Sequence, residues 1–231
     1  MARAVWITRA QPGADETAAR VRDLGLQPLV SPVLEVRRLT PEIDLDGVAA
    51  LVFTSRNAVT AWAALSPGRD LPVLAVGDAT AEAARQVGFG RVESAGGDVR
   101  DLAALVDRRA PELGGCLLHP RAAETAEDLA ALVRAPLVSA PVYETVEVEP
   151  SEALAELARL EVVLVHSPKA ARTLARLVAP SAALTFLCIS DRAAAPLLQA
   201  GHEKVLVAPF PAEAALLKLL REATGQGLEP G

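Results

Sequence analysis

The chain has 231 residues, a length that suits one large α/β domain or two small ones. Its 23 basic and 29 acidic residues give a net charge of −6, and no window gathers the Lys and Arg residues that phosphate neutralisation needs, so we expect no nucleic-acid partner. No apolar stretch approaches the roughly 20 residues that span a bilayer, and no signal peptide opens the chain. We therefore expect a cytoplasmic protein without membrane contact.

Composition also limits the chemistry. The apolar residues are mostly Ala, Leu and Val, since the chain has only four Phe, two Trp and one Tyr. Cys116 and Cys188 both fall in strand-like apolar runs, and the three His residues are scattered. Neither a disulfide framework nor a metal-ligand spacing is present, so we expect buried, reduced thiols and no metal.

Short runs rich in Val, Leu and Ile alternate with segments of helical period, a pattern typical of βαβ units around parallel sheets. Strands are predicted at 3–8, 27–30, 50–54, 72–76, 91–93, 115–119, 135–138, 161–166, 185–189 and 204–207. Helices are predicted at 13–24, 56–65, 78–87, 98–108, 122–133, 151–159, 169–178, 191–199 and 211–222. Segments 31–41 and 140–150 alternate apolar and polar residues between prolines, which indicates paired extended connectors.

The second half of the chain repeats the first. PLVSPVLEV at 28–36 returns as PLVSAPVYETVEV at 136–148, and VFTSRNAV returns as VHSPKAA, with Ser55 matched to Ser167. The repeat spacing is about 110 residues, a normal domain size. The sequence therefore predicts a duplicated α/β unit.

Candidate ligand groups follow the predicted strands. In a parallel sheet the site lies beyond the carboxyl ends of the strands, where helix N-termini offer free N–H groups. Hydroxyls, backbone amides, guanidinium groups and a lysine at these junctions favour carboxylate or phosphate binding. The candidates are Thr8, Arg9, Ser55, Asn57, Gly77, Arg121, Ser167, Lys169, Ser190 and Arg192.

Each candidate also has a structural interpretation. Ser55 and Ser167 fit helix N-caps, and Arg9 and Arg121 fit surface residues at strand ends. His119 and His166, at the ends of apolar strands, fit structural histidines, which we do not include in the site. The chain has no GxGxxG, P-loop, GxSxG or HExxH motif, so a catalyst of this sequence would work by positioning and acid–base help.

Tyr143, the single tyrosine, lies in the second connector near Thr145. A phenol is a proton or hydrogen-bond donor at neutral pH, so Tyr143 is a candidate donor to a departing hydroxyl.

Six motifs in order resemble the uroporphyrinogen-III synthase family over residues 3–222. They are FTSRNAV (53–59), AVGDATA (75–81), GGDVRDL (96–102), VYETV (142–146), VHSPKAA (165–171) and CISDRAA (188–194). The resemblance implies two flavodoxin-like α/β lobes with parallel sheets, joined by a two-stranded β ladder that the chain crosses twice. Lobe 1 would comprise 1–32 and 149–225, the connectors 33–41 and 139–148, and lobe 2 42–138, with a frayed tail at 226–231.

The same resemblance implies the activity. The substrate would be hydroxymethylbilane, a linear tetrapyrrole rich in carboxylates, which closes to uroporphyrinogen III with loss of water and inversion of ring D, without cofactor or metal. Tyr143 occupies the family's Y-x-T position and would be the acid, while the junction residues would hold carboxylates. Ser190-Asp191-Arg192-Ala193 departs from the Gly-Asp-x-Thr pattern seen at 77–80, and Arg192 is a substitute contact there. A monomer is expected, and a two-lobed binding or regulatory protein for a polyanion remains the alternative.

Overall fold

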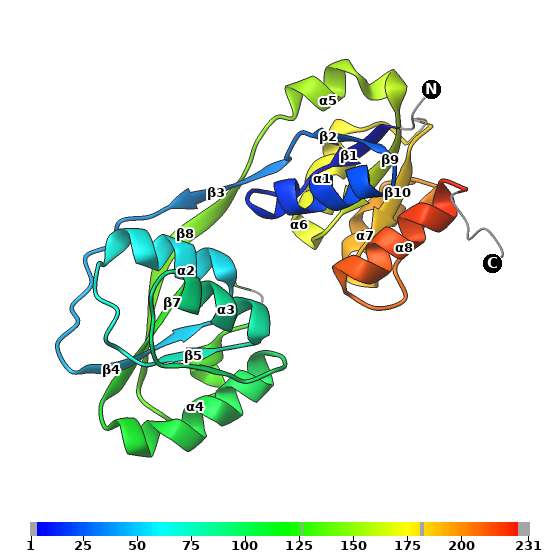
Figure 1. The fold of residues 1–231 in the computed structure, drawn as a ribbon. Helices are drawn as coiled ribbons and strands as arrows, with labels where there is room; N and C mark the ends of the chain where they lie inside the picture. Colours follow the sequence, from blue (N-terminus) through cyan, green and yellow to red (C-terminus); the bar gives the residue numbers. More distant parts are fainter. Residues whose placement is uncertain (1–3, 126, 181–182, 226–231) are drawn as a thin grey trace. The chain divides into compact units, whose positions relative to one another are not determined.

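The computed structural model describes residues 4–125, 127–180 and 183–225 (Figure 1). Two compact units divide the chain: unit 1 comprises the described residues up to Glu35 and from Val146 onward, and unit 2 comprises Val36–Thr145. Each unit holds one sheet, mostly parallel, with helices on both faces. The predicted α/β class with two parallel-sheet lobes is confirmed. The predicted frayed tail at 226–231 lies outside the described residues.

Unit 1 is built on a five-stranded parallel sheet of order β11-β10-β9-β1-β2. The order places β1 between β2 and β9, although more than a hundred residues separate β9 from β2 in the sequence. The elements are β1 (Ala4–Ile7), α1 (Gly13–Asp23), β2 (Gln27–Val30), α5 (Ser151–Ala155), η2 (Leu157–Arg159), β9 (Leu160–Val165), α6 (Pro168–Leu177), β10 (Thr185–Cys188), α7 (Asp191–Gln199), β11 (Val205–Val207) and α8 (Glu213–Ala223).

The two faces of this sheet follow from the alternation of side chains along each strand. On β1, Val5 and Ile7 pack against α1 and α8, while Trp6 points to the opposite face, against α6 and α7. All three side chains are fully buried, and the Trp6 indole Nε1 donates to the Ser31 carbonyl oxygen at 2.6 Å. The strand is thus apolar on both faces, as expected of a strand at the centre of a parallel sheet.

Unit 2 has a six-stranded sheet of order β3-β8-β7-β4-β5-β6. Helices α2 and α3 cover one face, and α4 with the short η1 covers the other. The elements are β3 (Leu34–Arg38), β4 (Val48–Phe53), α2 (Arg56–Leu65), β5 (Val73–Ala75), α3 (Asp78–Gln86), β6 (Val92–Ser94), α4 (Val99–Leu113), β7 (Cys116–Ala122), η1 (Leu129–Ala131) and β8 (Leu137–Glu147).

Strands β3 and β8 carry the chain out of unit 1 and back into it. They are neighbours in the sheet, where Val148 N donates to Val33 O at 3.1 Å and Leu39 N donates to Val142 O at 2.9 Å. Between these two hydrogen bonds the residue number increases from 33 to 39 along β3 and decreases from 148 to 142 along β8. The pair is therefore antiparallel and forms the predicted two-stranded ladder. Strand β8 is continuous with no break at residue 139, the predicted start of the connector, and it also pairs in parallel with β7.

The helix predicted at 122–133 was wrong. Strand β7 continues through Ala122, which pairs with Tyr143 of β8, and only the single 3-10 turn of η1 follows. Its start is fixed by the Asp128 carboxylate, which accepts from Ala130 N, and Leu129 is buried in the core. Strand pairing has therefore overridden the helical propensity of an Ala- and Glu-rich segment. Cys116 also differs from expectation, since it is only half-buried whereas Cys188 is buried; neither is in a disulfide.

Helix α4 begins with a reciprocal pair of side-chain caps. The Asp98 carboxylate accepts from Arg100 N at 2.8 Å and Asp101 N at 3.2 Å, and the Asp101 carboxylate accepts from Asp98 N at 2.8 Å. A Cβ on Gly97 would overlap the Asp101 carboxylate.

Gly97→Ala should therefore eject the Asp101 side chain and expose the Asp98 amide. We expect exchange of that amide hydrogen to become roughly 2- to 10-fold faster, the factor that one net hydrogen bond contributes. Hydrogen exchange followed by NMR measures it. Gly90→Ala is the matched control, because nothing lies within 4 Å of a Cβ at that glycine. Equal exchange in both variants would contradict the role given to Gly97.

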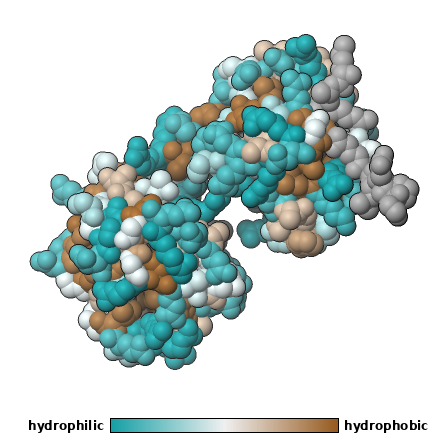
Figure 2. Space-filling model, viewed as in Figure 1, coloured by the Kyte–Doolittle hydropathy of each residue, from teal (hydrophilic) through white to brown (hydrophobic). Residues whose placement is uncertain are grey.

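The surface carries both hydrophilic and hydrophobic side chains. On the face shown in Figure 2, hydrophilic residues cover most of each unit, and hydrophobic patches appear between them. The large hydrophobic side chains that are most exposed, Val138, Leu198 and Phe210, lie on β8, on α7 and in the loop before α8. They come from separate elements, as scattered exposed apolar residues do on ordinary soluble surfaces.

Candidate active site

Parallel pairing in unit 2 places the carboxyl ends of neighbouring strands at one edge of the sheet. Strands β8, β7, β4 and β5 are adjacent and parallel, so the residues that follow β4 and β5 lie at the same edge as the end of β7. This edge carries Ser55, Gly77 and Arg121, together with Tyr143 of β8, whose register partner is Ala122. The structure thus gathers residues of unit 2 that lie up to 88 positions apart in the sequence.

The closest contact at this edge joins Tyr143 to Ser55. The Tyr143 hydroxyl lies 3.0 Å from Ser55 Oγ, and the ring is packed in the core that β4, α2 and β8 share, with only 7% of the residue exposed. Ser55 Oγ also accepts from Ala58 N at 3.1 Å and so caps α2. The N-cap interpretation of Ser55 is therefore confirmed, and the cap fixes the oxygen to which the phenol is hydrogen-bonded.

Of the other predicted site residues of unit 2, Gly77 and Arg121 make hydrogen bonds with backbone atoms. Gly77 is the N-cap of α3, and its carbonyl accepts from Thr80 N and Ala81 N. Asn57 lies half-buried in the first turn of α2. Arg121 Nη1 donates to the carbonyl oxygens of Ala122 at 2.7 Å and Ala123 at 3.0 Å, which stiffens the chain after β7.

In unit 1, the carboxyl edge is formed by the ends of β1, β9 and β10. Thr8 is fully buried, and its hydroxyl donates to Leu164 O at 2.7 Å, so it ties β1 to β9. Ser167 Oγ accepts from Ala170 N at 3.1 Å and Ser190 Oγ from Ala193 N at 3.3 Å, which makes them the N-caps of α6 and α7. Both serines therefore place a helix N-terminus, with its positive dipole end, at this edge.

The three cations of this edge have different surroundings. Arg9 donates from Nη1 to Thr17 Oγ1 at 3.3 Å and to Glu213 Oε2 at 3.2 Å. Lys169 is half-buried in the first turn of α6. The hydrogen bond from Arg176 is the main cause that lowers the pKa of Glu147, and the charge of Lys169 lowers it further. Arg192 is exposed in the first turn of α7. Arg9 is thus held at the edge by the Glu213 carboxylate.

Comparison with known proteins decides the family. A family model described as "Uroporphyrinogen-III synthase HemD" matches residues 15–218. The chain belongs to the uroporphyrinogen-III synthase family. The family predicted from the sequence motifs is therefore confirmed, and with it an enzyme of tetrapyrrole biosynthesis that closes a macrocycle.

Solved structures of uroporphyrinogen-III synthases share the fold. The enzyme from Helicobacter pylori 26695 is 21% identical with a TM-score of 0.71, covering 96% of this chain and 100% of its own. A mutant of the Thermus thermophilus enzyme is 15% identical with a TM-score of 0.55, covering 98% and 100%. No curated protein sequence matches the chain.

Two polar groups of this family member make contacts that were not predicted from the sequence. Glu213, the first residue of α8, accepts from Thr17 Oγ1 at 2.6 Å, His166 Nε2 at 2.9 Å and Arg9 Nη1 at 3.2 Å. Its position after a strand, at a helix start, was the available signal. Burial would raise the pKa of Glu213, but the hydrogen bonds from His166 and Thr17 and the charge of Arg9 lower it to about 2. The carboxylate is thus ionised throughout the neutral range.

The second missed contact is internal to unit 2. His119 is 1% exposed, and its Nε2 lies 3.2 Å from Thr54 Oγ1, next in sequence to Ser55. Burial, and then the charge of Arg121, lowers the pKa of His119 to about 4. The histidine is therefore neutral at pH 7, in agreement with its interpretation as a structural residue.

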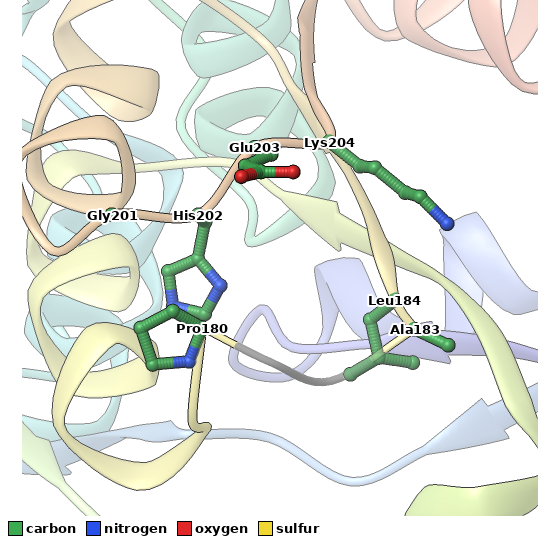
Figure 3. Close-up of a pocket in the computed structure, with 7 residues that line it drawn as sticks. All are labelled: Pro180, Ala183, Leu184, Gly201, His202, Glu203 and Lys204. Atoms are coloured by element: carbon green, nitrogen blue, oxygen red, sulfur yellow. The ribbon is translucent and has the colours of Figure 1, made fainter.

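Three hollows in this synthase lie at the opposite, amino edges of the sheets, and none of the predicted site residues lines them. One, of about 450 Å³, is formed before β10 and β11 by Pro180, Ala183, Leu184, Gly201, His202, Glu203 and Lys204 (Figure 3). The His202 ring lies beside Pro180 and meets the Phe186 ring edge-on at 4.7 Å, while the Lys204 side chain extends away from it. Tight ring packing of this kind indicates a structural role for His202.

Within the described ranges, no three His, Cys, Asp or Glu side chains are grouped so that they could hold a metal ion. None of the helices in that part of the chain is long and apolar enough to cross a membrane.

Proposed function

We propose that this protein cyclises hydroxymethylbilane to uroporphyrinogen III, with loss of water and inversion of ring D. The observation that carries the proposal is the match of the family model over 15–218, nearly the whole chain. The alternative, a polyanion-binding or regulatory protein that lacks turnover, has no observation in its favour beyond the same anion-binding edges.

The anion-binding character of both sheet edges supports this substrate class. Each edge combines N-terminal helix ends, capped by Ser55 and Gly77 in unit 2 and by Ser167 and Ser190 in unit 1, with basic side chains. Carboxylates are stabilised by such helix ends and by guanidinium groups. We assign carboxylate contacts to Arg9, Ser55, Asn57, Gly77, Arg121, Ser167, Lys169, Ser190 and Arg192; Thr8, whose hydroxyl is used by Leu164 O, supports Arg9 from the end of β1.

Tyr143 is the proposed acid. Its phenol would give a proton to the hydroxyl of the bilane, which leaves as water when its C–O bond breaks and an azafulvene remains. The fixed position of the phenol beside Ser55 Oγ supports this role, because proton transfer requires a donor held at hydrogen-bond distance. The substituted carbon of ring D then attacks the azafulvene carbon and becomes the centre of a spiro intermediate. Its bond to the methylene bridge of ring C breaks, which leaves an azafulvene on ring C. The free α carbon of ring D bonds to that methylene and loses its proton, so the ring is inverted. Positioning of that ring decides the isomer, because the free bilane closes without inversion.

The experiment is to give the purified protein freshly generated hydroxymethylbilane, without added cofactor or metal, and to separate the oxidised porphyrin isomers by chromatography. We expect type III isomer in excess over a protein-free control. Type I alone, from protein shown to be folded by circular dichroism, would favour the binding or regulatory alternative instead.

We also propose that the protein acts in the cytoplasm as a monomer, without nucleic acid. The net charge of −6 and the scattered distribution of exposed hydrophobic side chains support this.

A further inference from the structure

The Arg9 guanidinium is held in unit 1 by groups from two separate helices. Its Nη1 donates to Thr17 Oγ1 on α1 and to Glu213 Oε2 on α8. The same Glu213 oxygen accepts from His166 Nε2, which follows β9, while the other oxygen accepts from Thr17. Glu213 therefore links the ends of β1 and β9 to the start of α1, with 17% of its side chain exposed.

A glycine makes the space for this arrangement. Gly13 is the first residue of α1, and a Cβ there would lie 2.6 Å from Cζ, Nε and Nη2 of Arg9. Real contacts of this kind are never so short, so any side chain at position 13 would push the guanidinium away. The guanidinium thus lies flat against the backbone of α1 because residue 13 has no side chain.

Within the described residues, the protein binds the Arg9 guanidinium through hydrogen bonds of Nη1 alone. Both hydrogen bonds of Arg9 leave from Nη1, whereas Nε and Nη2 have no hydrogen-bond partner in the ranges that the structure describes. Nε–H and Nη2–H together form the two-pronged donor edge that matches a carboxylate. The Arg9 side chain is 26% exposed, so the group is not sealed inside the unit.

We propose that Glu213 is a positioning residue for substrate binding: it holds Nη1 of Arg9 so that the Nε–Nη2 edge receives one carboxylate of the tetrapyrrole. The inference rests on the proposed function, which places Arg9 among the substrate contacts. It adds that the contact depends on Glu213 and Gly13, neither of which touches the substrate. A guanidinium whose orientation is fixed beforehand loses less side-chain entropy on binding.

Four single variants and one double variant test the inference, with two readouts for each. The single variants are Arg9→Ala, Glu213→Gln, Gly13→Ala and the control Glu222→Gln, which removes a charge and an exposed ion pair with Lys218 from the same helix as Glu213. The double variant combines Arg9→Ala with Glu213→Gln. The readouts are KM and kcat for hydroxymethylbilane, and the Kd of uroporphyrin, a stable polycarboxylate. Urea unfolding of each variant separates binding effects from loss of folded protein.

We expect Arg9→Ala to raise KM and Kd roughly 10- to 100-fold, as loss of a charge-assisted hydrogen bond does. Glu213→Gln and Gly13→Ala should raise both roughly 3- to 10-fold with kcat little changed, although Gly13→Ala alters no charge. Glu213→Gln should have no further effect in the Arg9→Ala background, because the two changes act on one contact. Glu222→Gln should change neither KM nor Kd.

The outcomes separate this inference from the proposed function. If Arg9→Ala raises KM while Glu213→Gln leaves it unchanged, or if the two effects add, Glu213 is not the positioning residue and the proposed function stands. If Arg9→Ala changes neither KM nor Kd, the assignment of Arg9 and this inference both fail. If the wild-type protein forms no type III isomer, the proposed function fails, and the Kd values for uroporphyrin still decide whether Glu213 acts through Arg9.

Discussion

Tyr143→Phe should lower the rate of type III formation roughly 10- to 1000-fold, since general acid catalysis typically contributes 10²- to 10⁴-fold. The substitution removes only the hydroxyl oxygen and leaves the ring in the core formed by β4, α2 and β8. The folded state should therefore persist while the proton donor is lost. Stopped incubations with fresh hydroxymethylbilane, resolved into type I and type III isomers, give the rate, and type I should accumulate as enzymatic closure slows.

Ser55→Ala distinguishes a proton donor from a residue that merely holds its neighbour. This variant removes the hydrogen-bond partner of the phenol and the cap of α2, but it keeps the phenol itself. If Tyr143 is the acid, Ser55→Ala should slow the reaction less than Tyr143→Phe. Equal losses would mean that Tyr143 acts through Ser55. An unchanged rate in folded Tyr143→Phe would remove the phenol from the mechanism altogether.

Acid should destabilise the protein through His119. Its pKa is about 4 in the folded protein, against 6.5 for an ordinary histidine, because burial disfavours the charged ring and Arg121 repels it. Between these values the unfolded chain binds more protons, so this contribution to stability is complete above pH 6.5 and is lost as the pH falls towards 4. The loss should reach roughly 2 kcal/mol at pH 5 and about 3 kcal/mol near pH 4.

Urea unfolding at pH 7, 6 and 5 measures this loss. Glu213, with a pKa of about 2, stays ionised over that window and does not contribute. His119→Gln keeps an acceptor for the Thr54 hydroxyl but cannot gain a proton, so the free energy of unfolding should fall much less between pH 7 and 5. His202→Gln is the comparison variant: burial also lowers the pKa of His202, so this variant measures the share of the pH dependence that belongs to His202 and not to His119. A wild-type pH dependence in His119→Gln would show that another group is responsible.

The sequence allowed the alternation of strands and helices to be predicted, because buried parallel strands are apolar on both faces and helices show their own period. Strand-end positions such as Arg9, Ser55 and Ser167 could be selected for the same reason: topology places every such junction at one edge of a sheet. The helix predicted at 122–133 was wrong because the structure there depends on another part of the chain. Ala122 and Ala123 at the start of this segment are held by Tyr143 of β8, which follows in the chain, and local propensity carries no information about such a partner.

Contacts between side chains were the part that sequence could not supply. Glu213 is 204 residues from Arg9, and its position at a helix start after a strand does not say which residues it contacts. The pairing of His119 with Thr54 likewise requires β4 and β7 to be neighbours. Both contacts depend on strand order, which the alternation of elements alone does not determine.

The place of β1 in its sheet has a consequence for synthesis on the ribosome. Strand β1 is made before unit 2, yet its neighbour β9 begins at Leu160, after the whole of unit 2. Unit 2 is continuous in sequence and can fold as soon as it emerges, as domains generally do. Strand β1, apolar on both faces, must wait with one edge unpaired until β9 leaves the exit tunnel. During that interval the nascent chain is most exposed to aggregation, and chaperone binding near β1 matters most.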